Sequence, residues 1–166
     1  SRVTPMTEIE QQYFDSPAAF IDAMSLVVAA SHRELRMFSE TYPAALYENE
    51  SVIEALKQFC LIDSDVQILC LAPRGVLTLR SHPALLGLAH RMSSKIWLRE
   101  SPDATKECNG QFVVGDRRVV LHQPAIESAH AYYNPDYGVR AQQLIGGFDR
   151  IWAYATQSPE FRAVSI

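Results

Sequence analysis

The sequence predicts an α/β fold, a mixed sheet flanked by helices, and three observations support this class. Helical and strand-like patterns alternate through most of the chain. Residues 66–72 (VQILCLA) form a short, mostly apolar run, which is typical of a strand buried on both faces. Two further strand patterns flank Gly115-Asp116-Arg117, a sequence suited to a hairpin turn. We therefore expect a mostly parallel sheet that gains an antiparallel hairpin late in the chain.

Each helix and strand is predicted from a local signal. Ser16 and Pro17 are typical of a helix N-cap and the first helical residue, and Ser51 is expected to cap a second helix. The helices are expected over 17–31, 51–60, 83–93 and 135–157, and the strands over 33–39, 66–72, 96–99, 111–114 and 118–122.

The remaining segments have the composition of loops, over 40–49 and 101–108. Residues 124–133 are ambiguous and have room for one more strand near His130. The helix that opens at Asn134-Pro135 has the clearest period, near 3.6 residues. Gly146 and Gly147 lie inside it and are expected to allow close packing on the sheet. Its inward-facing residues are expected to be Val139, Leu144, Ile145, Phe148, Ile151, Trp152 and Ala155.

One domain is expected from the 166 residues, of which 48% are hydrophobic and 20% charged. Residues 1–12 are polar and carry no helical or strand period, so we expect a flexible N-terminal segment before a domain over 13–166. Because the chain starts without methionine, we also expect another domain to precede it in the native polypeptide.

The charge is distributed unevenly. A net charge of −4 argues against a general nucleic-acid binder. Residues 66–99, however, hold 5 basic and no acidic side chains, whereas residues 1–65 hold 4 basic and 11 acidic ones. The basic segment is interpreted either as a solvated helix face with its flanks or as a site for an anion such as phosphate. Its basic residues are Arg74, Arg80, Arg91, Lys95 and Arg99.

The cysteines and the apolar runs indicate a cytoplasmic protein. Cys60, Cys70 and Cys108 lie in or beside apolar runs, which predicts buried, reduced thiols. No apolar run approaches the roughly 18 residues of a membrane-spanning helix, and no signal-peptide pattern opens the chain. We expect neither a metal site nor a cofactor, since no two cysteines have ligand spacing to each other or to a histidine pair.

Residues 109–116 read Asn-Gly-Gln-Phe-Val-Val-Gly-Asp. This stretch resembles the phospholipase D signature HxKxxxxD, with Asn109 at the histidine position, Gln111 at the lysine position and only Asp116 kept. A phospholipase D-type site needs the imidazole as nucleophile and the ammonium to hold the negative oxygens. Neutral amides supply neither. The resemblance therefore implies a single phospholipase D-like half-domain without the family's chemistry.

The order of elements extends the resemblance over roughly residues 14–156. Phe148–Trp152 ends a long helix, similar to the "LF..LW" helix that closes phospholipase D-like modules. The chain also resembles an uncharacterised bacterial family of domains, found alone or after acetyltransferase domains. That similarity rests on Leu35–Ser39, Ala45–Tyr47 and Ile68–Arg74.

Family members build one active site from two motif copies, supplied by two halves of a chain or by two chains of a dimer. Because this chain carries one degenerate copy, the resemblance also implies a homodimer. Since residues 109 and 111 are two apart on a strand, both side chains are expected to point to one face, the catalytic cleft of the family. The alternative is that both amides satisfy local backbone groups and bind nothing. The candidate ligand-binding residues are Asn109, Gln111, Asp116, His130 and Arg74.

We therefore expect a non-catalytic binding, regulatory or dimerisation module, attached to or working beside an enzyme such as an acetyltransferase. Its ligand is expected to be a small anion or phosphorylated metabolite. One alternative is a phosphodiesterase or hydrolase with a centre rebuilt around His130 or His122. Another is a nucleic-acid-binding domain, which requires the basic residues of segment 66–99 to converge.

Overall fold

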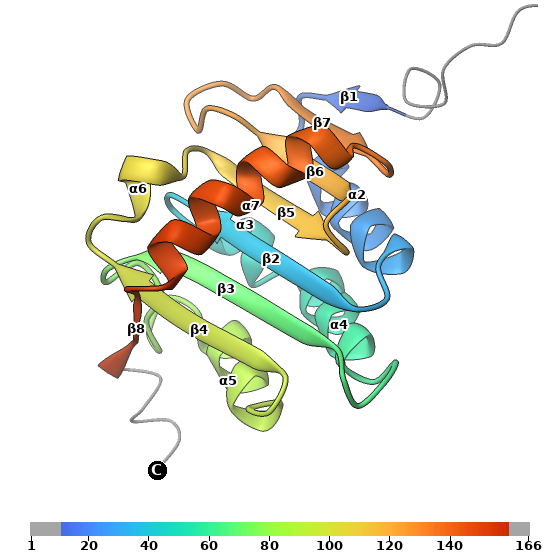
Figure 1. The fold of residues 1–166 in the computed structure, drawn as a ribbon. Helices are drawn as coiled ribbons and strands as arrows, with labels where there is room; N and C mark the ends of the chain where they lie inside the picture. The colour runs from blue at the N-terminus through green and yellow to red at the C-terminus, as the bar shows by residue number, and fades with distance from the viewer. Residues whose placement is uncertain (1–10, 160–166) are drawn as a thin grey trace, which may run out of the picture.

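The computed structural model describes residues 11–159, which form one eight-stranded sheet with helices on both faces (Figure 1). The strand order is β1-β7-β6-β5-β2-β3-β4-β8. The strands are β1 (Gln12–Phe14), β2 (Glu34–Ser39), β3 (Gln67–Pro73), β4 (Ile96–Ser101), β5 (Gln111–Gly115), β6 (Val119–Gln123), β7 (Ala131–Asn134) and β8 (Thr156–Gln157). The helices are α2 (Pro17–Ala30), α3 (Ala44–Tyr47), α4 (Glu50–Cys60), α5 (Pro83–Arg91), α6 (Ala104–Glu107) and α7 (Gly138–Trp152).

The sheet is mixed, as the fold class requires, but it is not mostly parallel. Only the pairs β2–β3 and β3–β4 are parallel, and the pairs on either side of them are antiparallel. The expectation of a mostly parallel sheet was wrong because β5 pairs antiparallel with β2, so the hairpin strands join the centre of the sheet. The hairpin itself is confirmed.

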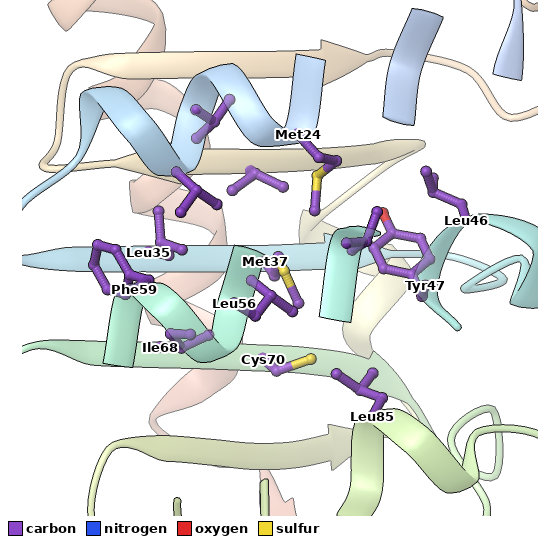
Figure 2. Packing of buried hydrophobic residues seen from close by; sticks show 14 of the residues in the cluster. Met24, Leu35, Met37, Leu46, Tyr47, Leu56, Phe59, Ile68, Cys70 and Leu85 are labelled. Carbon is purple, nitrogen blue, oxygen red and sulfur yellow. The ribbon is translucent and has the colours of Figure 1, made fainter. Parts of the chain in front are cut away.

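The two faces of the sheet are covered by different helices. Helices α2, α3, α4 and α5 lie behind the sheet in Figure 1, and α7 crosses its front with the short α6. Figure 2 shows Leu35 and Met37 of β2 among side chains of α2, α4 and β3, such as Leu56 and Cys70. Phe38 of β2 instead packs with α7 residues on the other face. Strand β2 thus supplies apolar side chains to both cores, and this double burial fixes its register.

Helix α2 follows its sequence signal closely. Ser16 is the N-cap, and its side chain accepts a hydrogen bond from the backbone N–H of Ala19. Helix α4 is capped differently from the expectation. Its N-cap is Asn49, whose side-chain oxygen accepts from the backbone N–H groups of Ser51 and Val52. The cap on Ser51 was wrong because Asn49, an equally good capping residue, comes two residues earlier.

Helix α7 is shorter than predicted, and one of its expected inward residues is exposed. Ile145 and Phe148 are buried, whereas Val139 is 70% exposed. At 3.6 residues per turn, Val139 lies roughly 160° around the helix from the buried Ala141. The period was right, but Val139 does not belong to the inward stripe.

Four short elements escaped the sequence patterns. Helices α3 and α6 occupy segments expected to be loops, and strands β1 and β8 pair at the two edges of the sheet. Gly147 packs against α6 rather than the sheet, since an added Cβ would lie 2.6 Å from the backbone oxygen of Glu107. Residues 1–10 of the expected N-terminal segment lie outside the described residues, and Gln12 opens β1.

The expected buried thiols are confirmed. Cys60, Cys70 and Cys108 are free and buried. Burial raises the pKa of the Cys70 and Cys108 thiols to about 12, so both remain protonated near neutral pH. Over residues 11–159, no helix combines the length and the apolar character that crossing a membrane would require.

Candidate functional site

The start of β5 lies at the edge of the sheet where the parallel strands end. Gln111, the first residue of β5, pairs with Ser39, the last residue of β2. In open α/β sheets this carboxyl edge is the common place for ligands. A cavity of about 360 Å³ opens here, and Gln111 and Gln123 both line it. We call it the amide cavity.

Gln111 is held by hydrogen bonds at both ends of its carboxamide. The Tyr47 hydroxyl donates to its Oε1 (2.8 Å), and its Nε2 donates to Oε1 of Gln123 (2.7 Å). The Gln123 Nε2 in turn donates to the backbone oxygen of Ser128 (2.6 Å). Gln111 is only 5% exposed, so this chain of amides forms a fixed, neutral wall of the cavity.

The rest of the amide cavity is mostly apolar and carries no positive charge. Carboxylates come from Asp15 and Glu127, and none of the described lining residues is Lys or Arg. Such a lining suits an apolar ligand that carries one or two hydrogen-bonding groups. The apolar walls come from β1, α2, α3 and the segment after β6, and include Phe14, Pro17, Phe20, Ile21, Leu46 and Ile126.

Asn109 does not share this cavity. It is exposed in the loop before β5 and borders a second cavity of about 200 Å³, which Phe112 and His122 also line. We call this the histidine cavity. It is lined by α7 residues, whereas the amide cavity is lined by α2 residues, so the two lie on opposite faces of the sheet (Figure 1).

The expectation that the two motif amides point to one face was therefore wrong. Gly110 stands between them with a φ of +66°, a left-handed conformation that breaks the alternation of a strand. A side chain at this position would also collide with the backbone oxygen of Gln123. Strand alternation begins only at Gln111.

Asp116 lies at the other end of β5 and lines neither cavity. Its carboxylate accepts hydrogen bonds from the backbone N–H groups of His32 (2.8 Å), Arg33 (2.8 Å) and Glu34 (3.1 Å). Partial burial raises the pKa of the Asp116 carboxyl, but these N–H groups and the nearby His32 outweigh it, so the pKa is lowered overall. Asp116 fastens the loop between α2 and β2 to the hairpin.

The other two candidate residues also lie away from the cavities. His130 is exposed just before β7, with its backbone N–H donating to Ser128 Oγ (3.3 Å). Arg74 is exposed in the turn after β3. Neither lines the amide cavity or the histidine cavity.

The basic segment does not form one patch. Lys95 precedes β4 and donates to the backbone oxygens of Cys60 and Asp63 at the end of α4. Arg74 follows β3, and because β3 and β4 are parallel, these two cations stand at opposite ends of the strands. Arg99 donates to the backbone oxygen of Trp152 (3.0 Å) and stacks on its ring at 4.6 Å.

His122 is a buried titratable group on β6, opposite Phe112 of β5. It is 5% exposed, and its Nδ1 lies 2.9 Å from the Tyr132 hydroxyl. Burial, helped by the charge of Arg140, lowers the pKa of His122 to about 4. The ring is therefore neutral near pH 7 and a weak proton acceptor. Within residues 11–159, no group of three or more His, Cys, Asp or Glu side chains is placed to hold a metal.

Sequence reasoning missed Gln123 and Tyr47 as partners of Gln111. A signal for Gln123 was present, because counting back from the hairpin turn pairs position 111 with position 123. Tyr47 gave no such signal. It reaches Gln111 only because the unpredicted helix α3 turns it toward the sheet.

The α/β fold described above is similar to the folds of phospholipase D family members. The structure is similar to Nuc from Salmonella typhimurium, a phospholipase D family member, with a TM-score of 0.63 and 14% identity over 89% of this chain and 96% of that one. NucT from Helicobacter pylori is similar with a TM-score of 0.59 and 9% identity, over 89% and 98% of the two chains. TrmBL2, an archaeal chromatin protein described as having a novel mode of DNA binding, matches with a TM-score of 0.61 and 10% identity. That match covers 89% of this chain and 54% of TrmBL2.

The particular family follows from the sequence. The model of the domain of unknown function DUF7931 matches residues 16–164, and the chain belongs to this family. No curated protein matches the sequence significantly.

Proposed function

We propose that this chain is a non-catalytic phospholipase D-like binding module whose ligand occupies the amide cavity. One observation carries the proposal: Gln111, at the position of the signature lysine, is buried and hydrogen-bonded at both ends in the wall of a mostly apolar cavity. The cavity offers two amides, but none of its described lining residues carries a positive charge to hold a phosphoryl group.

The geometry around the motif supports loss of the phosphoryl chemistry. Asn109 carries no nucleophile and borders the other cavity. A centre rebuilt around His122 would depend on an imidazole whose pKa is lowered to about 4. His130, the other replacement, lies outside both cavities. Neither histidine of the hydrolase alternative therefore lines the amide cavity.

The lining favours a neutral or cationic ligand over the phosphorylated metabolite expected from the sequence. Asp15 and Glu127 would repel an anion, and no described lining residue is basic. We include in the proposal a homodimer and an acetyltransferase partner, both implied by the family resemblance. Dimerisation would let the module present two such cavities to its enzyme partner.

The test uses two ligands of one shape, benzamide and benzoate, in thermal unfolding. Because a ligand that binds only the folded chain raises Tm, benzamide should stabilise the protein more than benzoate does. Ala45→Trp, which fills the cavity from its rim, should abolish the shift. It is compared with Ala129→Trp, at a second exposed alanine of the same lining, which should weaken binding without changing the preference for the amide.

Three outcomes would contradict the proposal. A larger shift with benzoate or with glucose 6-phosphate would reverse the charge preference. Turnover of bis(p-nitrophenyl) phosphate that disappears in His122→Ala or His130→Ala would support the hydrolase. Salt-sensitive binding of a DNA oligonucleotide would support the DNA-binding alternative. The structural similarity to TrmBL2 is the reason to test that alternative.

A further inference from the structure

The histidine cavity, on the α7 face, is lined by hydrogen-bond donors that have no acceptor in the described part of the chain. It has a volume of about 200 Å³. Asn109 and Gln143 both line it, and neither side chain has a hydrogen-bond partner among residues 11–159. His122 forms part of the same lining, buried against the rings of Phe112 and Tyr132.

The contact with Tyr132 favours one nitrogen of His122 as the proton carrier if the hydroxyl is the donor. The Tyr132 hydroxyl makes one hydrogen bond in the described chain, to Nδ1 of His122 at 2.9 Å. Burial raises the pKa of Tyr132 to about 12, so the hydroxyl keeps its proton and is able to donate it to this nitrogen. With Nδ1 accepting, the neutral ring carries its proton on Nε2, which has no hydrogen-bond partner among residues 11–159.

Two charged features lie at or near the cavity: the ion pair between Glu107 and Arg150, and the guanidinium of Arg140. Glu107 lines the cavity, but its carboxylate is bound by Arg150 (2.7 Å). Arg140 stands one turn before Gln143 on α7 and makes no ion pair in the described chain. Its guanidinium stacks over the Tyr137 ring at 5.9 Å, and its charge reaches His122. Arg140 does not line the cavity, but it is a cation without an ion pair in the described chain, and it lies close enough to His122 to act on that ring electrostatically.

We propose that the histidine cavity is a second binding site, selective for a small monocarboxylate. The carboxylate would accept hydrogen bonds from His122 Nε2–H and from the amides of Asn109 and Gln143, with Arg140 balancing its single charge. The carbon chain would lie against the apolar wall of Phe112, Leu144 and Pro124. A free acid and the C-terminal carboxylate of a peptide offer the same chemistry.

The experiment uses the whole chain labelled with ¹⁵N-histidine and sodium propionate as the probe. Before any ligand is added, the ¹⁵N shifts of His122 should show the proton on Nε2. Propionate should then move the Nε2 resonance saturably. Propionamide, which has the same shape without the charge, should bind about tenfold more weakly.

Matched variants separate this site from other surfaces. Arg140→Gln should weaken propionate about tenfold, whereas Arg117→Gln, an exposed arginine at the far end of β5, should leave it unchanged. Ala45→Trp should also leave it unchanged, because the amide cavity lies on the other face. The second site is thereby tested independently of the proposed function.

If acetyl-dialanine binds as tightly as propionate, the site is supported and its carboxylate ligand is the C-terminus of a peptide. If acetyl-dialanine binds much more weakly than propionate, the site is supported and its ligand is a free acid. The proposal is overturned if the His122 proton resides on Nδ1, or if propionamide matches propionate. Inorganic phosphate binding more tightly than propionate would overturn it as well, since the site would then select a dianion.

Discussion

The two ends of strand β5 keep different parts of the signature that the sequence resembles. At its C-terminal end Asp116 retains the residue type of the signature, and its carboxylate holds three backbone N–H groups of the α2–β2 loop. At its N-terminal end Asn109 and Gln111 replace the histidine and the lysine. The C-terminal end is tied to the backbone of a neighbouring loop, whereas the N-terminal end carries neutral amides at or near two cavities.

The two ends also differ in the hydrogen-bond partners of their polar side chains. Asp116 is charged, partly exposed and engaged with backbone donors from a segment more than eighty residues earlier in the chain. Gln111 is neutral, buried and engaged with side chains that line the amide cavity. A substitution at Asp116 should therefore test stability, and one at the amide end should test binding and chemistry.

The largest expected effect comes from Asp116→Ala. Removing the carboxylate leaves three N–H groups without their acceptor, and alanine is also disfavoured at the φ of +51° found here. We expect a loss of about 2 kcal/mol in the free energy of unfolding, allowing for partial exposure. Urea unfolding of the wild type and the variant measures this difference in the free energy of unfolding.

Two variants sharpen this result. Asp116→Asn keeps an acceptor oxygen and tolerates the left-handed backbone, so it should lose about 1 kcal/mol. Asp22→Ala, at an exposed position of α2, should change stability by less than about 0.5 kcal/mol. Equal, small losses for all three variants would show that Asp116 does not hold the loop.

A smaller effect is expected from pH. The pKa of Asp116 is lowered in the folded chain, so the folded state binds a proton less readily than the unfolded state does. The stability that this carboxylate contributes is therefore complete above the pKa of an ordinary Asp and is lost as pH falls through the lowered folded value. The difference in stability between the wild type and Asp116→Asn should shrink over that window. A difference independent of pH would contradict the assignment.

Much of the fold could be predicted, because its signals are local. Ser16-Pro17 marked the start of α2, the apolar run marked β3, and the turn at Gly115 marked the β5–β6 hairpin. Elements of four residues or fewer, such as α3 and β8, are too short to show a period, and tertiary contacts hold them in place. The direction of β5 depends on which strand it pairs with, and no local pattern encodes that choice.

The candidate site was predicted less completely. The motif drew attention to Gln111, which lines the amide cavity, but its role in binding stays a prediction. It could not show that Asn109 faces elsewhere, because glycine adopts left- and right-handed backbones with similar ease and Gly110 takes the left-handed one. Nor could it show the partners of Asp116, which lie far away in the sequence and meet it only in the folded chain.

The smallest effect should follow from rebuilding the signature as Asn109→His/Gln111→Lys. The two side chains would start on opposite faces of the sheet, so the imidazole and the ammonium could not act on one phosphoryl group. We expect hydrolysis of bis(p-nitrophenyl) phosphate by the double variant to stay at the background of the wild type. Saturable turnover would mean that the loop at Gly110 can refold into a strand. In that case the residue types alone, and not the backbone between them, would have removed the activity, and the two ends of β5 would differ only in chemistry.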